Sequence, residues 1–456
     1  MILKRIKSEG IAHISYFVSS ENEAFVVDPR RDAKTYLKKA WEAESNIKYV
    51  FETHRNEDYV IGSLEIADVV DVEIYHGPDL DWKYGNTLED GQEFQMGALK
   101  IKAIHTPGHT DESTSYAVYD TTTGEEAVLV FTGDALFVGD TGRIDMYGPD
   151  KSRKNAENLY NSIFNKILPL GDQTILLPAH GSGSVCGAAI NEREHSTLGL
   201  ERMQNPVLQL REKEEFIEFK LNEHHYFAPY FKKMEEYNLE GPPLLRNIPR
   251  YQPLLPGQFR KLIDSGAIVV DTRNPASFGV AHIKNSYNIW LKGLPSYVGW
   301  VLPYDKPILL VVENFSELNK AYKYLIRLGY DDIKGYLVGG IIAWYSNNFP
   351  VGKINSITAD DLKERLEQKE DNIILDVRGV TEYEGGHIEG AKNIYVGKLE
   401  DKLETLPKEK PIIAVCGNGA RASMATSILG KNGFDKIFNV LGSMKAWQKA
   451  GYPILK

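Results

Sequence analysis

The loop FETHRNEDYV, residues 51–60, begins like a metal-binding motif but lacks two of the usual ligands. An apolar segment leads into His54, after which a common metal loop would continue as H-x-H-x-D-H. Asn56 stands at the position of the second histidine and Tyr59 at the position of the last. The loop is therefore either a metal site that has lost its function or a site for a different metal.

Three further segments place polar residues at the ends of strand-like runs. His109 lies in HTPGHT after ALKIKAIH, Asp134 ends VLVFTGD, and His180 lies in LPAHG after TILL. Together with the Thr-His pair of the first loop, these motifs resemble the metallo-β-lactamase superfamily in type and order. The resemblance implies an αββα sandwich with a metal bound at one edge.

The number of remaining ligands decides the chemistry of this site. The two-zinc hydrolases of the superfamily hold one ion with three histidines and a bridging aspartate, and the other with an aspartate, two histidines and the same bridge. Asn56 removes a ligand of the first ion, and Tyr59 removes one of the second. His54, His109 and Asp134 remain, and two imidazoles with one carboxylate and open positions are typical of non-haem Fe(II) oxygenases. We therefore expect one Fe(II) per chain.

This ligand set resembles that of the persulfide dioxygenases, a mononuclear-iron branch of the superfamily. The segment DALFVGDTGRID contains the G-R-x-D pattern of that branch, with Arg143 as its arginine. The resemblance implies that Arg143 holds the thiol part of a persulfide. The alternative is an arginine paired with Asp140 or Asp145, because forked arginine–carboxylate pairs are common.

Residues around these ligands are assigned supporting roles. We expect Asp58 and His180 to hydrogen-bond the metal ligands. Cys186 has two readings: it carries a persulfide near the iron, or it is a small buried hydrophobe, the usual role of a free cysteine. The other histidines of this part are expected to be non-catalytic, namely His13, His76, His105, His195, His224 and His225.

The carboxy-terminal part of the chain contains an internal repeat. AIVVDTRNPASFGVAHIKNSYNI (267–289) corresponds to NIILDVRGVTEYEGGHIEGAKNI (372–394), so that Asp271 matches Asp376 and His282 matches His387. Each unit alternates strands and helices with Gly-rich turns, which is typical of a small α/β domain. The period is longer than that of solenoid repeats, so the repeat predicts tandem domains.

The second repeat carries a cysteine at the end of a strand, in VCGNGARASMATSIL. The loop Gly417, Asn418, Gly419 and Ala420 separates Cys416 from Arg421. Main-chain N–H groups of such a loop and the start of the following helix stabilise a thiolate or persulfide anion. Arg421 adds a fixed positive charge and a forked donor.

The size of this loop distinguishes two classes of enzyme. Cysteine phosphatases have five residues between cysteine and arginine, whereas the shorter loop here suits sulfur. With the D-x-R, HIEGAKNI and GSMKAW segments, residues 353–456 resemble the rhodanese sulfurtransferases. The resemblance implies that Cys416 is the sulfur-carrying nucleophile and that residues 417–421 bind its substrate.

The first repeat lacks the chemical groups of the second. Val312 aligns with Cys416, and Glu317 aligns with Arg421. We therefore interpret residues 251–352 as an inactive rhodanese-like domain. Because Asp271, Arg273 and His282 persist without a nucleophile, we expect Asp376, Arg378 and His387 to maintain the fold rather than to act in catalysis.

Composition limits the remaining possibilities. The 456 residues suggest about three domains, and the net charge of −10 disfavours nucleic acid or an anionic membrane as partner. Two cysteines exclude a disulfide framework and favour a reducing cytoplasm. No apolar run reaches the roughly 18 residues of a membrane helix, and no secretory signal is expected. Many short strand patterns up to about residue 180, followed by helical patterns, predict a first domain with a helical connector over 1–250.

The predicted architecture is an α/β chain, with an αββα metallo-β-lactamase sandwich followed by two rhodanese-like α/β domains. The whole chain resembles bacterial persulfide dioxygenase–rhodanese fusions. This implies Fe(II)-dependent oxidation of a low-molecular-weight persulfide by O2 to sulfite and thiol, and sulfur transfer through Cys416 that gives thiosulfate, in sulfide detoxification. The sequence leaves the carrier thiol open, and a homo-oligomer is compatible with it.

Three alternatives compete with this prediction. A zinc thioester hydrolase of the glyoxalase II kind requires two zinc ions, and the missing ligands count against it. A non-enzymatic sulfur-binding protein would have lost its metal at Asn56 and Tyr59. A sulfurtransferase alone would have an inert amino-terminal half.

Overall fold

The computed structural model describes residues 1–456, which divide into two compact units. The first comprises Met1–Asn247 with Ile326–Gly329, and the second comprises Ile248–Leu325 with Tyr330–Lys456. The division lies close to the predicted boundary at residue 250. None of the helices combines the length and the apolar character that crossing a membrane requires.

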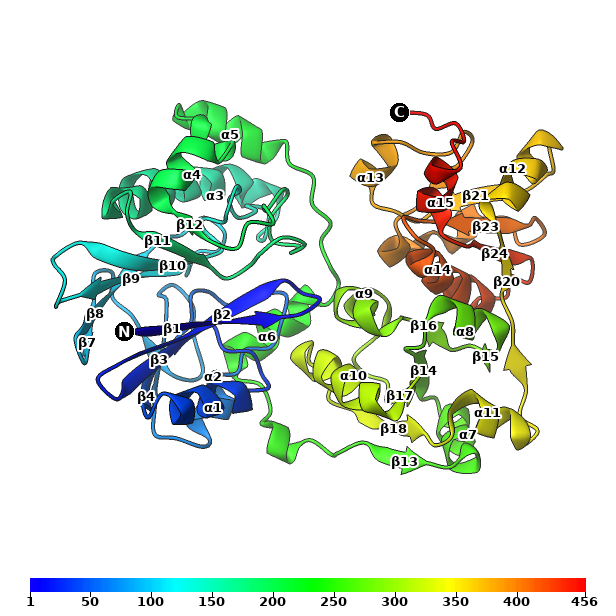
Figure 1. Ribbon diagram of the computed structural model, residues 1–456, viewed down its shortest axis with the longest axis horizontal. Coiled ribbons are helices and arrows are strands. Elements are labelled where there is room, and N and C mark those ends of the chain that lie inside the picture. Colours follow the sequence, from blue (N-terminus) through cyan, green and yellow to red (C-terminus); the bar gives the residue numbers. More distant parts are fainter. The chain divides into compact units, whose positions relative to one another are not determined.

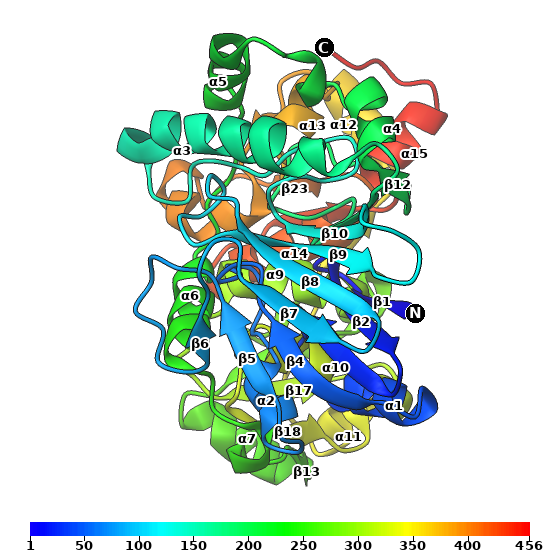
Figure 2. The same cartoon turned by 90° about the vertical axis from the view of Figure 1, so that its left-hand side faces the viewer.

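Two six-stranded sheets form the centre of the first unit (Figures 1 and 2). In sheet order, one contains β1 (Ile2–Ser8), β2 (His13–Ser20), β3 (Glu23–Val27), β4 (Asn46–Phe51), β5 (Glu73–His76) and β6 (Asn86–Thr87). The other contains β12 (Ser196–Thr197), β11 (Ile175–Pro178), β10 (Ala127–Gly133), β9 (Thr114–Asp120), β8 (Leu99–His105) and β7 (Glu93–Met96). Apolar side chains of both sheets, among them Phe51 and Phe131, pack between them as one core.

Helices cover the outer face of each sheet. One layer consists of α1 (Lys34–Glu42) and α2 (Ser63–Ala67). The other consists of α3 (Pro149–Asn161) with its π-helical continuation Ser162–Ile167, α4 (Leu198–Gln204) and α5 (Lys213–Leu221). The helix α6 (Phe231–Glu240) ends the unit. This order of layers confirms the predicted αββα sandwich.

The second unit contains two five-stranded parallel sheets with the same strand order. The first sheet contains β13 (Gln252–Leu254), β18 (Ile333–Leu337), β17 (Ile308–Val311), β14 (Ile268–Asp271) and β16 (Tyr287–Asn288). The second contains β20 (Asn355–Ile357), β24 (Ile437–Val440), β23 (Ile412–Val415), β21 (Ile373–Asp376) and β22 (Lys392–Asn393). The short strands β15 (His282–Ile283) and β19 (Val351–Gly352) pair beside the first sheet. The strand segments IVV of β14 and IIAV of β23 are continuously apolar, as expected of parallel strands that helices cover on both faces.

The helices of the two domains also correspond. The first domain contains α7 (Pro256–Asp264), α8 (Pro275–Val280), α9 (Leu294–Val301), α10 (Phe315–Arg327) and α11 (Gly340–Ser346). The second contains α12 (Ala359–Glu367), α13 (Val380–Glu384), α14 (Ala420–Lys431) and α15 (Ser443–Lys449). The repeat in the sequence is therefore a repeat of two α/β domains.

The Asp-x-Arg turn has the same contacts in both domains. Arg273 donates from Nη2 to Asp271 Oδ2 over 2.6 Å, and Arg378 does the same to Asp376. His282 and His387 each place Nδ1 3.0 Å from a main-chain oxygen one helical turn earlier. Contacts that are identical with and without a nucleophile agree with the predicted structural role.

We predict that His282 makes the second unit sensitive to mild acid. Burial lowers the pKa of His282 to about 4, and the charge of Arg273 acts in the same direction. The unfolded chain, with a histidine pKa near 6.5, binds more protons between these values, so the stability contribution present above pH ~6.5 is lost as the pH falls toward 4. By this linkage, the cost between pH 7 and pH 5 is about 2 kcal/mol.

Urea unfolding at the two pH values measures this effect. The variant His282→Asn, whose amide can donate in place of Nδ1–H, should lose about 2 kcal/mol less than the wild type over this range. The exposed His195→Asn is the matched control and should follow the wild type. Parallel losses in all three proteins would show that His282 does not carry the sensitivity.

Candidate metal centre and sulfur loop

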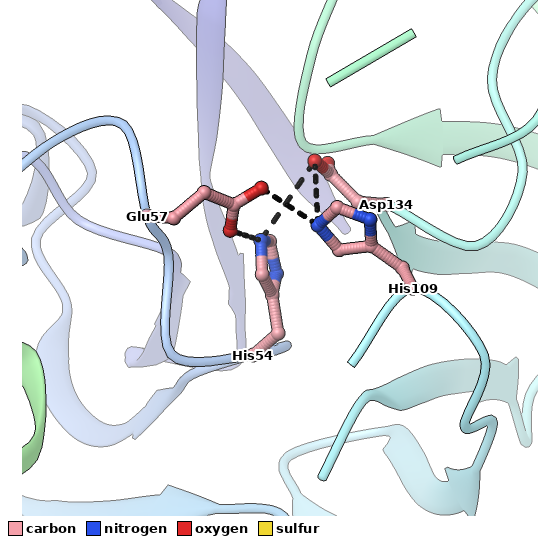
Figure 3. Close-up of side chains that lie close together, drawn as sticks. All are labelled: His54, Glu57, His109 and Asp134. Atoms are coloured by element: carbon pink, nitrogen blue, oxygen red, sulfur yellow. Dashed lines mark hydrogen bonds and ion pairs between the residues drawn. The ribbon is translucent and has the colours of Figure 1, made fainter. Parts of the chain in front are cut away.

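Three predicted ligands converge from the ends of three strands (Figure 3). His54 follows β4, His109 lies between β8 and β9, and Asp134 follows β10. All three side chains are buried. Asp134 Oδ2 lies 3.8 Å from His54 Nε2 and 3.6 Å from His109 Nε2. The structure thus brings together the two imidazoles and the carboxylate that the sequence singled out.

Glu57 joins this group as a fourth donor, which the sequence analysis missed. Its Oε1 lies 2.8 Å from His109 Nε2, and its Oε2 lies 3.7 Å from His54 Nε2. One donor atom from each of Glu57, His54, His109 and Asp134 fits within a group less than 4.8 Å across. The site therefore has two imidazoles and two carboxylates rather than one.

The backbone at Asn56 explains how Glu57 reaches the centre. Asn56 has a φ of 24°, and asparagine adopts positive φ more readily than most residues. Its side-chain Nδ2 donates to His54 O over 2.9 Å, which closes a tight turn and directs the Asn56 side chain at the backbone. The side chain beside His54 and His109 therefore comes from residue 57 rather than from residue 56. An asparagine in place of the second histidine, followed directly by an acid, is the signal that could have revealed this.

The second replaced residue, Tyr59, does not face the metal centre. Its ring packs against the His13 imidazole at a centroid distance of 3.8 Å, and its hydroxyl lies 3.4 Å from Asp28 O. His13 in turn hydrogen-bonds Ser8 and the main chain of Asp28. These contacts agree with the expected non-catalytic role of His13.

The ligands are oriented by further hydrogen bonds. Thr53 Oγ1 lies 2.9 Å from His54 Nδ1 and donates to Asp28 Oδ2 over 2.7 Å. His109 Nδ1 donates to the main-chain oxygen of Arg143 over 2.9 Å. In both histidines Nε2 therefore faces the centre. Such contacts set the tautomer and ring orientation of metal-binding histidines.

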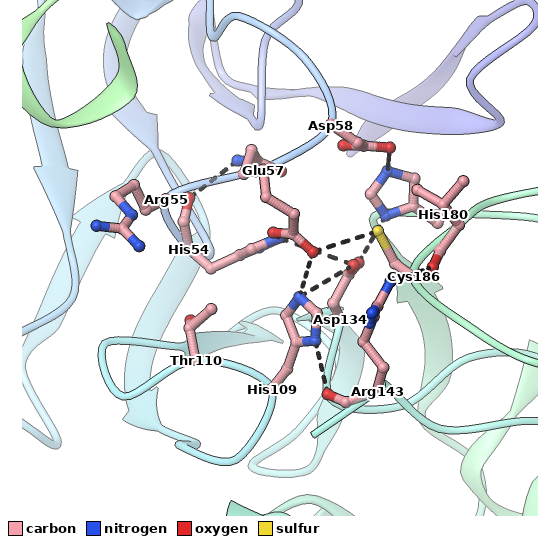
Figure 4. Close-up of polar contacts among 12 residues, drawn as sticks. His54, Arg55, Glu57, Asp58, His109, Thr110, Asp134, Arg143, His180 and Cys186 are labelled. Atoms are coloured by element: carbon pink, nitrogen blue, oxygen red, sulfur yellow. Dashed lines mark hydrogen bonds and ion pairs between the residues drawn. The ribbon is translucent and has the colours of Figure 1, made fainter. Parts of the chain in front are cut away.

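A second group of polar side chains adjoins the first (Figure 4). His180 donates from Nδ1 to Asp134 Oδ1 over 2.7 Å, and its Nε2 lies 2.9 Å from Asp58 Oδ2. Cys186 is buried and its thiol donates to Glu57 Oε1 over 3.4 Å. His180 thus contacts the predicted ligand Asp134, whereas Asp58 contacts His180, and Cys186 lies beside Glu57.

The charges of this cluster are strongly coupled. Burial alone would raise the pKa of Glu57, but the charge and hydrogen bond of His109 hold it well below its usual range. Burial opposes protonation of His109, yet Glu57 raises the pKa of that imidazole to about 9. For Cys186, burial raises the thiol pKa well above its ordinary value, and the neighbouring Asp58 adds to this. The cluster therefore combines ionised carboxylates with a neutral thiol.

The donor set fits a divalent metal ion. His54 Nε2 and Asp134 Oδ2 are buried and have no hydrogen-bond partner within the protein, and a buried polar atom without a partner is costly. Ligands about 2.1 Å from one ion lie roughly 3.0–3.4 Å apart, and the separations of 3.6–3.8 Å observed here are close to that. Imidazole and carboxylate donors suit iron and zinc alike.

Arg143 is held by several partners within the first unit. Its Nε and Nη2 donate to Asp145 over 2.6 and 2.7 Å, and its Nη1 donates to two main-chain oxygens over 3.2 Å. The pairing with Asp145 is the alternative that the sequence left open. Its main-chain oxygen, which orients His109, is a contribution that the sequence did not suggest.

The Cys416 loop connects β23 to α14. Gly419, at a φ of 97°, turns its N–H toward Cys416 and donates to the sulfur over 3.1 Å. The main chain of Cys416 is fixed by Ser443 Oγ and by the N–H of Met444, both at 2.9 Å. The thiol is buried at the start of α14. The loop thus directs one main-chain N–H, that of Gly419, at the Cys416 sulfur.

Arg421 faces a carboxylate across this loop. It donates from Nη1 and Nη2 to Glu382 of α13 over 2.5 and 2.8 Å. In the first domain, Glu313 instead accepts from Ser277 Oγ and Asn274 Nδ2, both over 3.0 Å. The first domain thus ties its loop to α8 with neutral donors and has no thiol there.

Comparison with known proteins agrees with this architecture. The Metallo-beta-lactamase superfamily model matches residues 11–180, and the Rhodanese-like domain model matches residues 255–347 and 358–450. The chain is thus a metallo-β-lactamase fold followed by two rhodanese domains.

Individual relatives match parts or most of the chain. A crystal structure of a metallo-beta-lactamase from Staphylococcus aureus subsp. aureus COL is similar with a TM-score of 0.66 and 29% identity, over 74% of this chain and 98% of that chain. The hydroxyacylglutathione hydrolase GloC of Haemophilus influenzae is 26% identical over 41% of this chain and 88% of its own. The putative sulfur carrier protein YrkF of Bacillus subtilis is 35% identical over 21% of this chain and 51% of its own.

We predict that Glu57→Gln weakens metal binding by about tenfold or more, because the neutral amide is a poorer ligand than a carboxylate and no longer balances His109. Metal analysis of anaerobically purified protein and competition with a chelator measure this change. Glu201→Gln, at another buried glutamate of the same unit, is the matched control and should retain wild-type metal content. If Glu57→Gln binds the metal as tightly as the wild type, Glu57 contacts His109 but does not bind the metal.

Proposed function

We propose that the first domain is an Fe(II)-dependent persulfide dioxygenase and that the last domain is a sulfurtransferase acting through Cys416. Together they would remove sulfide and persulfide in the cytoplasm. The observation that supports this most is the donor set around Asp134, from which Asn56 and Tyr59 are turned away. A Cys–Arg sulfur loop on the same chain supports a substrate that contains sulfur.

His54, His109 and Asp134 would hold the metal, together with Glu57. Bound Fe(II) would supply the redox chemistry that lets O2 react with a persulfide sulfur. The protein's own contribution is orientation and burial: Thr53 and the main chain of Arg143 direct the two Nε2 atoms inward. Glu57 would be the fourth side chain to hold the ion, through a carboxylate that also lies 2.8 Å from His109 Nε2.

The proposed reaction balances as follows. One persulfide, RSSH, reacts with O2 and water to give the thiol RSH, sulfite and two protons. Both oxygen atoms of O2 go to the terminal sulfur, and water supplies the third oxygen when the sulfur–sulfur bond breaks. The terminal sulfur is oxidised, and O2 is the oxidant.

The sulfurtransferase half would consume this sulfite. The Cys416 thiolate attacks the outer sulfur of a second persulfide, and the thiol RSH leaves. Sulfite then attacks the outer sulfur of the Cys416 persulfide anion, the sulfur–sulfur bond breaks, and thiosulfate leaves while Cys416 returns to its thiolate form. The N–H of Gly419 and the start of α14 would stabilise the negative sulfur in each step.

A thioester hydrolase of the glyoxalase II kind is the second candidate. The similarity to a hydroxyacylglutathione hydrolase favours it. It would require two metal ions and would consume no O2. Its weakness is that Asn56 and Tyr59 replace two of the histidines that hold a pair of zinc ions.

We predict that substitutions at the two centres separate the two activities. His54→Ala should abolish O2 uptake with glutathione persulfide and leave sulfur transfer intact, because it removes one metal ligand. Cys416→Ser should abolish thiosulfate formation and leave O2 uptake intact, because it removes the nucleophile. An oxygen electrode and chromatography of sulfite and thiosulfate measure both products.

Three results would contradict the proposal. If the metal-loaded wild type takes up no O2 with the persulfide, the first domain is not a dioxygenase. Two zinc ions per chain with thioester hydrolysis would establish the second candidate instead. Thiosulfate formation that survives Cys416→Ser would remove the assigned nucleophile.

A further inference from the structure

His54 takes part in a chain of hydrogen bonds that leads away from the metal centre. Its Nδ1 lies 2.9 Å from Thr53 Oγ1, and Thr53 Oγ1 lies 2.7 Å from Asp28 Oδ2. The main-chain N–H of Thr53 donates to the other oxygen of the same carboxylate over 2.8 Å. All three residues are buried. Asp28 therefore accepts both hydrogens that Thr53 offers, in the interior of the domain.

Asp28 is held in this place through its own main chain. It directly follows β3 and has a φ of 49°, a left-handed conformation that aspartate adopts more readily than most residues. Its N–H donates to Phe51 O over 3.0 Å. Its main-chain oxygen accepts from His13 Nε2 over 3.0 Å and lies 3.4 Å from the Tyr59 hydroxyl. The tyrosine that replaces a histidine of the metal motif thus contacts Asp28 instead.

The direction of the hydrogen bonds follows from what each group can donate or accept. Burial raises the pKa of Asp28 to about 6, although the charge of His54 opposes this, so the carboxylate is ionised at about pH 8 and can only accept. The single hydroxyl hydrogen of Thr53 is directed to that carboxylate. Thr53 Oγ1 therefore offers only a lone pair to His54, and Nδ1 must carry the hydrogen. An imidazole whose hydrogen lies on Nδ1 keeps the lone pair of Nε2 for a metal ion.

We propose that Asp28 is a positioning residue of the metal centre, which holds the Thr53 hydroxyl as an acceptor and thereby keeps the hydrogen of His54 on Nδ1. His54 Nε2 lies 3.8 Å from Asp134 Oδ2 and 3.7 Å from Glu57 Oε2 and has no hydrogen-bond partner, as a nitrogen that binds a metal requires. The inference rests on metal binding at His54 within the proposed function, and it does not depend on which reaction follows.

The substitution Asp28→Asn should reverse the chain of hydrogen bonds. The new amide can accept from the N–H of Thr53 only if its NH2 group faces Thr53 Oγ1, because two donors would otherwise meet. The Thr53 hydroxyl would then turn its hydrogen toward His54 Nδ1, and the hydrogen of the imidazole would move to Nε2. We expect this variant to bind zinc at least about tenfold more weakly, as is typical when a partner of a metal-binding histidine is changed.

Two measurements on the full chain at about pH 8 test this, namely zinc affinity by competition with a chelator and NMR of isotope-labelled histidines in the zinc-loaded protein. The wild type should show a hydrogen on His54 Nδ1, assigned by its loss in His54→Ala, and Asp28→Asn should lack it. Thr53→Val should weaken zinc binding as Asp28→Asn does, whereas Thr53→Ser, which keeps the hydroxyl, should match the wild type. Asp71→Asn, at an exposed aspartate of the same unit, is the control and should change neither measurement.

The double variant Asp28→Asn with Thr53→Val separates positioning from a general effect on the fold. If Asp28 acts through the Thr53 hydroxyl, the double variant binds zinc as tightly as Thr53→Val alone. A full further loss in the double variant refutes the role of Asp28, as does wild-type affinity with a retained Nδ1 hydrogen in Asp28→Asn. If Asp28→Asn does not fold, equal zinc affinities of Thr53→Val and Thr53→Ser refute it instead.

Failure of the proposed function gives a different result. A wild type that binds zinc through His54 but takes up no O2 with persulfide when loaded with iron would refute the dioxygenase and leave the role of Asp28 standing. A wild type whose His54 signals do not change on addition of zinc would refute both the metal centre and this inference.

Discussion

Ionised carboxylates buried beside histidines are the feature on which the first domain depends. Glu57, in the loop after β4, and Asp134, directly after β10, are both buried beside strands that form the central core. Burying charge is costly unless it is compensated. The histidines His109 and His180 compensate part of it through short contacts, and a divalent cation would complete the balance. The same cluster that would perform chemistry is therefore also a condition of folding.

The two rhodanese domains separate what supports the fold from what supports the reaction. Both keep the Asp-x-Arg turn and the histidine that binds a main-chain oxygen. Only the second has a thiol at the end of its central strand, with Gly419 turned toward the sulfur. The first domain has Glu313 in the corresponding loop, bound to neutral donors. Comparing the two repeats therefore distinguishes residues that support the fold from residues that support the proposed reaction.

Much of this arrangement could be predicted from the sequence, for physical reasons. Short motifs at the ends of strands follow one another in an order that reflects the topology of the fold. His54, His109 and Asp134 could therefore be predicted as neighbours from the sequence. Glu57 could not be found, because the motif places the metal-binding side chain at residue 56. The turn at Asn56, which has a positive φ, brings the side chain of residue 57 to the site instead. For Arg143 the sequence left two interpretations, binding of a persulfide and pairing with a carboxylate, because a sequence does not show which group a long side chain reaches. The contact between Trp300 of α9 and Tyr395 of the second domain depends on how two domains pack, which no local pattern encodes.

The helix α14 has one further consequence for how such a chain can evolve. It is lined with small residues and is buried along nearly all of its length, by its own sheet and by the neighbouring repeat. Without the thiol-free repeat, one side of this helix would be exposed to water. Ser423 would lose its acceptor, Asn288 Oδ1, and Ser427 would lose its donor, the main-chain N–H of Asn288. Deletion of the first repeat would therefore disturb the second as well, which limits how the two repeats can be separated.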